Sequence, residues 1–345
     1  MNKDNNMTKG KITGIVANLI MVEVDGPVQQ NEICYIIQKN SSLMSEVIKV
    51  MGSTAYIQAF ESTRGLKVDD EVEFSGSMLE VDLGPGILSR NYDGLQNDLD
   101  KMEGIFLERG AQTEALDHEK QYNFKPIAQE GDTVTAGDWL GEVTENWLPH
   151  KIMVPFKFQG KYTIQSITAE GTYAIDNQIA MLQDEDGRDH EVTMVQRWPV
   201  KIPIKQYREK PRPFKLLETG IRIIDTLNPI GEGGTGFIPG PFGSGKTVLQ
   251  HALSKQAEAD MIIMAACGER ANEVVEIFTE FPELEDPRSG RKLMERTTII
   301  ANTSNMPVAA REASVYTAMT IAEYYRAMGL KILLLADSTS RWAQA

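Results

Sequence analysis

Short apolar runs alternate with turn-forming residues along the first 78 positions. The apolar positions fall in runs at 12–24, 33–37, 47–50, 55–59 and 72–74. Within the first run, Gly14 is the break between apolar groups. Turn residues such as Asp25-Gly26-Pro27 and Gly52-Ser53 separate the runs. Several short strands at this spacing predict a small closed β-barrel over residues 1–78.

Residues 79–117 are predicted to be a linker and the beginning of a C-terminal domain. The segment Asp82–Ile87 is rich in Gly and Pro and predicts a turn. Farther on, the apolar positions of Leu95–Leu107 recur at a spacing that suits one short helix.

A second β-rich region covers residues 118–195 and is predicted to be an inserted, peripheral domain. Gly131–Val134 and Gly137–Gly141 have the pattern of turn-plus-strand units, which resemble the hairpins of lipoyl and biotinyl carrier domains. Lys151 would then be an attachment lysine, or the hairpins would form a β-hammerhead with a structural role. The structural interpretation is favoured, because Lys151 follows Pro149 closely and does not occupy a clear tight turn.

The pattern changes in the last third of the chain. Arg197–Pro213 holds four prolines and predicts a stiff, extended connector. Beyond it, apolar strands expected at 235–238, 261–266, 297–301 and 331–336 alternate with helices expected at 247–258, 272–280 and 308–328. Apolar strands separated by helices predict a parallel sheet covered on both faces, so 196–345 is an α/β domain.

Composition and charge narrow the possible functions. The net charge of −14 disfavours non-specific nucleic-acid binding. Two cysteines cannot form a disulfide framework, and the polar start lacks the apolar core of a signal peptide. The longest apolar runs, such as Met261–Cys267, are about seven residues, whereas a membrane helix needs about 20. A soluble, cytoplasmic protein is therefore expected.

The strongest chemical signal is the segment 240–247, which fits the pattern G-x-x-x-x-G-K-[ST] at every position. Backbone N–H groups of such a loop surround phosphate oxygens, and the following helix adds its positive end. Lys246 would neutralise phosphate charge and Thr247 would bind Mg²⁺. A Gly-rich turn without a ligand is the alternative, which the apolar elements expected on both sides disfavour. The predicted nucleotide-binding residues are Gly240, Pro241, Phe242, Gly243, Ser244, Gly245, Lys246, Thr247 and Val248.

Two further positions suit a nucleotide site. Asp337 ends the apolar run Lys331–Ala336, as in a Walker B strand, and would hold Mg²⁺. Glu269 follows the predicted strand 261–266, where a carboxylate could polarise the attacking water, and Arg270 could contact the γ-phosphate or brace Glu269. The alternatives are a buried strand that simply ends in Asp and an ordinary surface charge pair.

Other tempting features are rejected. Residues 231–236 match G-x-G-x-x-G but precede the predicted strand instead of following it. The four histidines are scattered without metal-ligand spacing. Cys267 lacks a His partner at motif spacing and is interpreted as a packed thiol.

These residues give the chain a resemblance to the catalytic A subunits of V/A-type (vacuolar/archaeal-type) rotary ATPases. The P-loop follows about 240 residues, which leaves room for the insert that the F-type β subunit lacks. The intact Lys246-Thr247 pair separates the chain from the non-catalytic B subunit. Ala271 departs from the family's glycine. The similar stretches are 238–248, Gly268–Glu273, Asn302–Glu312, Ala336–Ala343, Leu83–Leu88 and His150–Pro155.

The resemblance implies a multidomain fold: an N-terminal β-barrel, a β-rich inserted (bulge) domain and a RecA-like P-loop α/β nucleotide-binding domain. In the family, the rest of the sheet, the adenine pocket and a helical C-terminal domain follow the Walker B strand. We therefore expect a C-terminally truncated chain with an incomplete nucleotide domain.

The implied activity is hydrolysis or synthesis of MgATP coupled to H⁺ or Na⁺ transport, with ATP or ADP and Mg²⁺ as ligands. The implied partners are B subunits in an alternating A3B3 hexamer, which supply an arginine finger, and central and peripheral stalk subunits. Membrane contact would occur only through partners, at the cytoplasmic face of the cell membrane. Alternatives are a Rho-like nucleic-acid motor, which the charge disfavours, a flagellar or secretion-type hexameric ATPase, which lacks the insert, and a non-catalytic module, which Glu269 disfavours.

Overall fold

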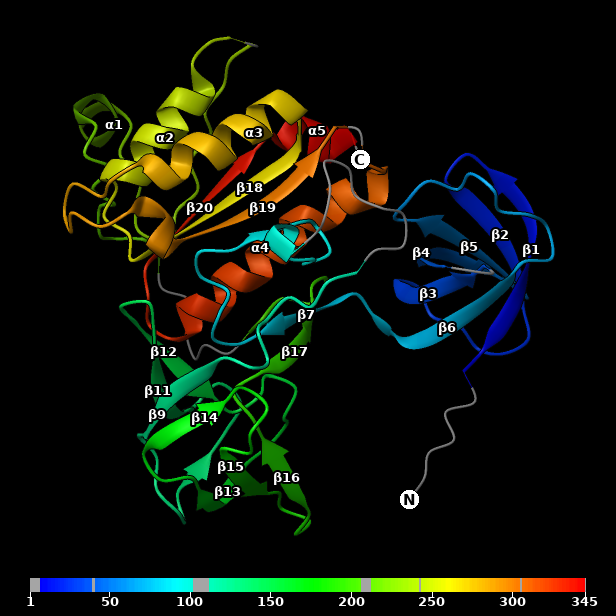
Figure 1. Cartoon of the computed structure of the whole chain (residues 1–345), viewed down its shortest axis with the longest axis horizontal. Helices are drawn as coiled ribbons and strands as arrows, with labels where there is room; N and C mark the ends of the chain where they lie inside the picture. The colour runs from blue at the N-terminus through cyan, green and yellow to red at the C-terminus, as the bar shows by residue number, and fades with distance from the viewer. Residues whose placement is uncertain are drawn as a thin grey trace.

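The computed structural model describes residues 7–38, 41–101, 112–205, 212–241, 243–304 and 306–344. Three lobes are visible in Figure 1: a barrel, a β-rich insert and a helix-covered sheet. Among the described helices, none is both long and apolar enough to cross a membrane.

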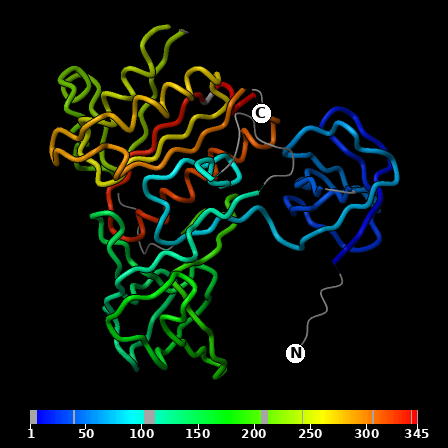
Figure 2. Tube along the Cα trace, in the orientation of Figure 1, coloured from blue at the N-terminus to red at the C-terminus, as the bar shows by residue number. Residues whose placement is uncertain are grey.

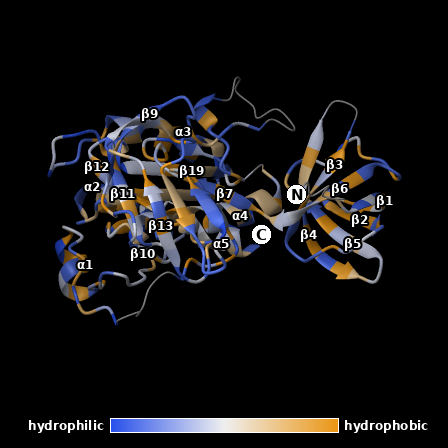
Figure 3. Cartoon of the chain, turned by 90° about the horizontal axis from the view of Figure 1, so that it is seen from below, coloured by the Kyte–Doolittle hydropathy of each residue, from blue (hydrophilic) through white to orange (hydrophobic). Residues whose placement is uncertain are grey.

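The N-terminal lobe is the predicted closed barrel, with strands joined in the order β1-β2-β5-β4-β3-β6. Its core consists of inward-facing apolar residues from all six strands, among them Ile20, Ile36 and Ile57. Figure 3 shows this lobe in a second view, with hydrophobic and hydrophilic residues mixed along its strands. The strands are β1 (Lys9–Val16), β2 (Leu19–Val24), β3 (Glu32–Ile37), β4 (Ser42–Met51), β5 (Thr54–Ala59) and β6 (Glu71–Met78).

One detail of the barrel differs from the prediction. The apolar run 12–24 breaks at Ala17-Asn18 and not at Gly14, because Val16 pairs with Leu19 in a tight antiparallel hairpin. Ala17 has a positive φ of 55° there. Gly14 instead lies where the register of this hairpin shifts, and glycine tolerates such a bulge.

The segment after the barrel contributes strands to two places. β7 (Glu80–Leu83) pairs antiparallel with β17 (Gln196–Pro199), so the segment that follows the barrel lies beside the segment that leaves the insert (Figure 2). β8 (Asn91–Tyr92) pairs with the sheet of the C-terminal lobe. The helix predicted at Leu95–Leu107 is wrong for its first residues, where only the 3₁₀ turn η1 (Leu99–Lys101) forms; residues 102–107 lie outside the described ranges.

The insert consists of two four-stranded sheets, in the orders β10-β13-β15-β16 and β12-β11-β9-β14. None of these strands pairs with the sheet of the C-terminal lobe. Lys151 lies inside a strand, opposite Glu142, with which it forms an ion pair, and this favours the structural interpretation of the hairpins. The strands are β9 (Gln121–Pro126), β10 (Thr133–Val134), β11 (Trp139–Glu145), β12 (Leu148–Met153), β13 (Tyr162–Ile167), β14 (Gly171–Ala174), β15 (Ala180–Gln183) and β16 (Asp189–Val192).

The C-terminal lobe contains the predicted parallel sheet, in the order β20-β18-β19-β8. Alternate residues of β18 pack on opposite faces: Ile263 joins a cluster with α4, and Ile262 joins one with α2 and α3. Figure 1 shows α4 on one face of this sheet and α2 and α3 on the other. The elements are α1 (Arg222–Leu227), α2 (Lys246–Gln256), β18 (Met261–Glu269), α3 (Ala271–Glu280), η2 (Phe281–Glu283), η3 (Leu293–Arg296), β19 (Thr297–Thr303), α4 (Val308–Ala327), β20 (Ile332–Asp337) and α5 (Thr339–Gln344).

The strand predicted at Thr235–Ile238 is wrong, because this segment has no regular secondary structure. It pairs with no strand of the described sheet, and a segment is a β-strand only when it pairs with another strand. Gly233, Gly234 and Gly236 raise the conformational entropy that ordering it would cost.

Candidate functional site

The P-loop lies at the beginning of α2. Gly243 and Gly245 have positive φ values of 76° and 85°, which glycine adopts without strain. A Cβ atom at Gly240 would come within 2.3 Å of Ser244 Oγ, so a side chain there would block the close turn. Phe242 lies outside the described residues.

The first turn of α2 presents the predicted phosphate-binding groups. Lys246 Nζ donates hydrogen bonds to the carbonyl oxygens of Gly240 and Pro241, both at 3.0 Å, so its ammonium lies across the loop. Thr247 is the next residue and is partly buried. Val248 is 73% exposed and can serve the loop only through its backbone. The first turn carries no acidic residue, so no carboxylate of its own competes for its positive end.

Two carboxylates lie at the carboxyl edge of the sheet beside this helix. Glu269 ends β18 and Asp337 ends β20, and these strands are parallel neighbours, so their carboxyl ends meet. Burial raises the pKa of Asp337, while the charge of Lys246 lowers it, which places the P-loop lysine close to this carboxylate. The three groups thus form one site.

The pKa of Glu269 is raised to about 7, first by burial, then by its hydrogen bond with Glu273 and by the charge of Asp337. A carboxyl group with a pKa close to neutral is well matched to accept a proton from water. Arg270 is the exposed N-cap residue of α3, next to this carboxylate.

Sequence reasoning missed three members of the site. Glu273 hydrogen-bonds Glu269, Gln250 hydrogen-bonds Asp337, and Arg341 lowers the pKa of both carboxyl groups by its charge. A signal existed for Glu273 and Arg341, since each lies four residues after a predicted site residue. Gln250 required knowledge of how α2 packs on β20.

The donors at this edge suit Mg²⁺. The hydroxyl of Thr247 and the carboxylate of Asp337 are hard oxygen ligands, and Mg²⁺ typically takes one or two protein ligands together with water and phosphate oxygens. The described residues hold no cluster of three or more His, Cys, Asp or Glu side chains that could enclose a metal alone. A cation shared with a nucleotide fits this arrangement.

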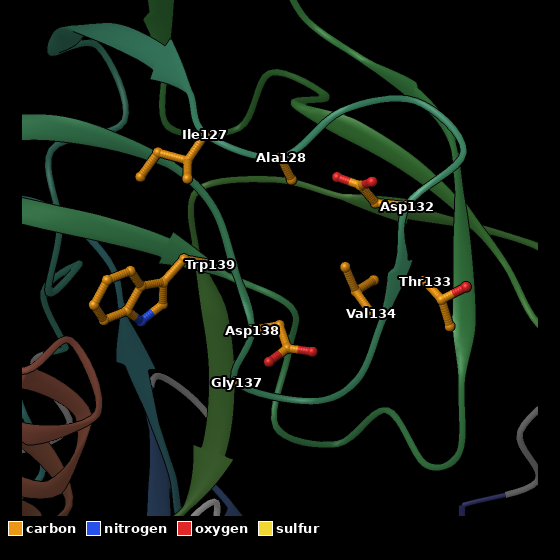
Figure 4. Close-up of a pocket in the computed structure, with 8 residues that line it drawn as sticks. All are labelled: Ile127, Ala128, Asp132, Thr133, Val134, Gly137, Asp138 and Trp139. Atoms are coloured by element: carbon orange, nitrogen blue, oxygen red, sulfur yellow. The ribbon is translucent and has the colours of Figure 1, made fainter.

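A separate hollow of about 510 Å³ lies in the insert (Figure 4). Ile127, Trp139, Asp132 and Asp138 are among the residues that line it. None of the predicted nucleotide-binding residues lines it, so the candidate chemistry and this hollow are distinct features of the molecule.

With a P-loop helix and two carboxylates at one edge of a parallel sheet, the C-terminal lobe is a P-loop nucleotide-binding domain. The chain belongs to the ATP synthase alpha/beta family. Three domain models of that family match it: the beta-barrel domain over residues 12–76, the barrel-sandwich domain over 113–201 and the nucleotide-binding domain over 220–345.

Within this family the chain is similar to proteins named V-type ATP synthase alpha chain. It is 55% identical to that of Treponema denticola over 341 residues and 54% identical to that of Borrelia garinii over 341 residues. These matches cover 98% of this chain but only 58% and 59% of the relatives, so the chain spans about three fifths of their length.

The fold is also similar to a secretion ATPase. The assembled ATPase EscN of the enteropathogenic E. coli type III secretion system matches with a TM-score of 0.58 and 20% identity, over 97% of this chain and 58% of that one. At this identity the match supports the fold alone.

Proposed function

We propose that the chain is the catalytic nucleotide-binding part of a V/A-type rotary ATPase and that it hydrolyses or synthesises MgATP. The observation that carries the proposal is the convergence of Lys246, Asp337 and Glu269 at the carboxyl edge of one parallel sheet. Our division into domains at 1–78, 79–117, 118–195 and 196–345 remains a prediction.

The proposed chemistry follows from the positions of these groups. The P-loop N–H groups and the ammonium of Lys246 hold the phosphates, and Thr247 and Asp337 hold Mg²⁺, which supplies charge neutralisation when bound. Glu269 orients the attacking water and accepts its proton, since the pKa of this carboxyl group is about 7. Arg270 supports the γ-phosphate or braces Glu269.

The assembly and the coupled ion are part of the same proposal. It includes an alternating hexamer with B subunits, stalk partners and coupling to H⁺ or Na⁺ transport at the inner face of the cell membrane. The relatives named V-type ATP synthase alpha chain support a part in an ATP synthase. An arginine finger from a neighbouring B subunit would complete the site. The net charge of −14 supports a function without nucleic acid.

The test is the Glu269→Gln substitution in the assembled complex, with Glu276→Gln on the exposed face of α3 as the control. The amide can hydrogen-bond water but cannot accept its proton. We expect kcat to fall about 10²–10⁴-fold while nucleotide binding persists. Turnover near that of the control would mean that another group activates the water, and the proposed mechanism would be wrong.

A further inference from the structure

Arg311 reaches the turn at Gly268, directly before Glu269, from the face of the sheet opposite the P-loop helix. We call this turn the catalytic turn. Gly268 precedes Glu269 and has a positive φ of 75°. A Cβ atom built on Gly268 would lie 2.8 Å from Arg311 Cδ and 3.4 Å from Arg341 Cβ. The methylene stem of Arg311 therefore lies directly against the glycine that turns the chain into Glu269.

The strand geometry explains why this contact is made at Gly268. Cys267 packs in the cluster that contains α4, whereas Ala266 packs in the cluster with α2 and α3. The register of β18 against β19 then shifts between Cys267 and Glu269. At Gly268 the side chains of the strand therefore stop alternating regularly between the two faces of the sheet. The direction in which the Glu269 side chain points depends on this residue.

Arg311 is costly for the fold. Its buried Nε atom finds no hydrogen-bond partner within the described ranges. Asn302, fully buried opposite Cys267, also lacks partners for both side-chain atoms among the described residues. A buried donor without a partner lowers stability, and an apolar side chain of similar length would avoid that loss. What Arg311 contributes at this position is therefore the packing of its methylene stem against Gly268, since its Nε atom adds no stability there.

We propose that Arg311 is a positioning residue for Glu269: from α4, its stem packs across Gly268 and fixes the turn that presents the Glu269 carboxylate. The inference rests on the proposed function, because it assigns Arg311 a role in placing the water-activating group. Arg311 itself contacts neither water nor nucleotide in this role.

The test compares three substitutions in the assembled complex. Arg311→Ala removes the stem and should lower kcat about 10²-fold, the loss typical of a misplacement near 1 Å, with ATP affinity unchanged. Arg311→Lys and Arg311→Met keep a stem over Gly268 and should restore most of the rate. Arg326→Ala, on the same helix in an exposed ion pair with Glu323, is the control. Lost ATP affinity at unchanged kcat, or a Lys variant as slow as the Ala variant, would overturn the inference.

A double-mutant cycle separates positioning from a general loss of packing. Gly268→Ala should slow turnover, because its Cβ would displace the Arg311 stem. Once Arg311→Ala has removed that stem, Gly268→Ala should cost less, and the loss that remains should come from its positive φ of 75° and from Arg341. Additive effects would show that the two residues act independently and would overturn the inference even if one variant folds poorly. Glu269→Gln measured in parallel separates the two proposals: if it stays active, the proposed function fails, whatever Arg311 does.

Discussion

At the scale of single residues, burial and neighbouring groups set the ionisation of the carboxyl groups at the carboxyl edge of the sheet. The ammonium of Lys246 donates hydrogen bonds to carbonyl oxygens of its own loop, and its charge lowers the pKa of Asp337. A nucleotide would replace these carbonyl partners with phosphate oxygens, which carry full negative charge. The lysine is therefore expected to contribute more to the nucleotide complex than to the free protein.

Lys246→Ala should weaken ATP binding about 10–100-fold, since hydrogen bonds to charged groups are worth about 1.5–3 kcal/mol. Titration of a fluorescent ATP analogue against the assembled complex measures the change. Lys255→Ala, in the last turn of the same helix, controls for loss of helix charge. Equal affinity in the Lys246 and Lys255 variants would contradict the phosphate-binding role.

The raised pKa of Glu269 predicts a pH dependence. The carboxylate accepts a proton only when ionised, so kcat/KM should fall as the pH drops below about 7. Glu273→Gln removes a neighbour that raises this pKa, and the acid limb should move to lower pH. The pH profile of kcat/KM measures both effects. An acid limb that stays in place in the Glu273→Gln variant would show that Glu273 does not tune this group.

The sequence predicts the candidate site residues that carry a local signal and gives no sign of those that depend on the fold. Glu269 and Asp337 each end an apolar strand, and the ends of parallel strands share an edge, so their meeting could be predicted. Arg311 comes from α4 and reaches Gly268 only through tertiary packing. No spacing in the sequence indicates that contact.

At the scale of elements, α4 is linked to every lobe of the molecule, and its link to the barrel runs through Lys201. Near its beginning, Arg311 packs on the catalytic turn. The adjacent Glu312 shares Lys201 with Glu46 of the barrel, at 3.6 and 2.7 Å respectively. Near its end, α4 joins the insert, so a displacement of either outer lobe would act on the helix that carries Arg311.

The junction with the insert is a fully buried polar network. Glu145 Oε2 accepts hydrogen bonds from His150 Nδ1 at 2.7 Å and from the Tyr325 hydroxyl at 2.8 Å. His150 Nε2 lies 2.8 Å from the hydroxyl of Tyr324. Glu145 Oε1 accepts the backbone N–H groups of Gly86 and Leu88. One carboxylate of the insert thereby links α4 to the segment that follows the barrel.

This network predicts a stability change with pH. Burial raises the pKa of Glu145, but His150, the Leu88 N–H and Tyr325 outweigh it, and the pKa falls below the ordinary value of 4.5. A lowered pKa in the folded state stabilises the fold above about 4.5, and this stabilisation is lost as the pH falls further.

The measurement is thermal unfolding from neutral pH to below 4.5. Glu145→Gln should cost about 1.5–3 kcal/mol at neutral pH, because its amide cannot accept from all these donors. The variant should also lose less stability on acidification than the wild type. A parallel loss in both proteins would contradict the assignment.

Elements whose apolar residues pair inside the molecule were predictable, and those without partners were not. The buried strand 261–266 and the helix 308–328 formed within three residues of the expected limits. Thr235–Ile238 is apolar enough for a strand but finds no ladder partner in the described sheet. The local sequence pattern shows which residues of a segment are apolar. Whether the segment forms a strand depends on a neighbouring strand with which it can pair.

At the scale of the whole molecule, the lobes do not correspond to separate cores. Most buried residues of the barrel form a cluster of their own, whereas Ile33 and Phe60 join the cluster of the central sheet. The inner sheet of the insert, including Phe124 and Ile152, shares one cluster with α4 and the central sheet. Within the described part of the insert, the outer sheet, with Ile164 and Leu182, has a core of its own. The insert is thus peripheral in its strand pairing but continuous with the nucleotide lobe in its packing.

Two matched substitutions should show which regions each core stabilises. Ile152→Ala and Ile57→Ala each remove a buried isoleucine, 1% and 0% exposed, and each should cost about 2–5 kcal/mol locally. Because Ile152 belongs to the shared cluster, its loss should speed amide exchange in β11, β12 and α4 together, and leave the barrel unchanged. Ile57→Ala should speed exchange in the barrel alone. Hydrogen exchange measured peptide by peptide in the full-length protein resolves the regions. If Ile152→Ala affected the insert but left α4 fully protected, the insert and the nucleotide lobe would be energetically independent, and a displacement of the insert could not reach the catalytic turn through α4.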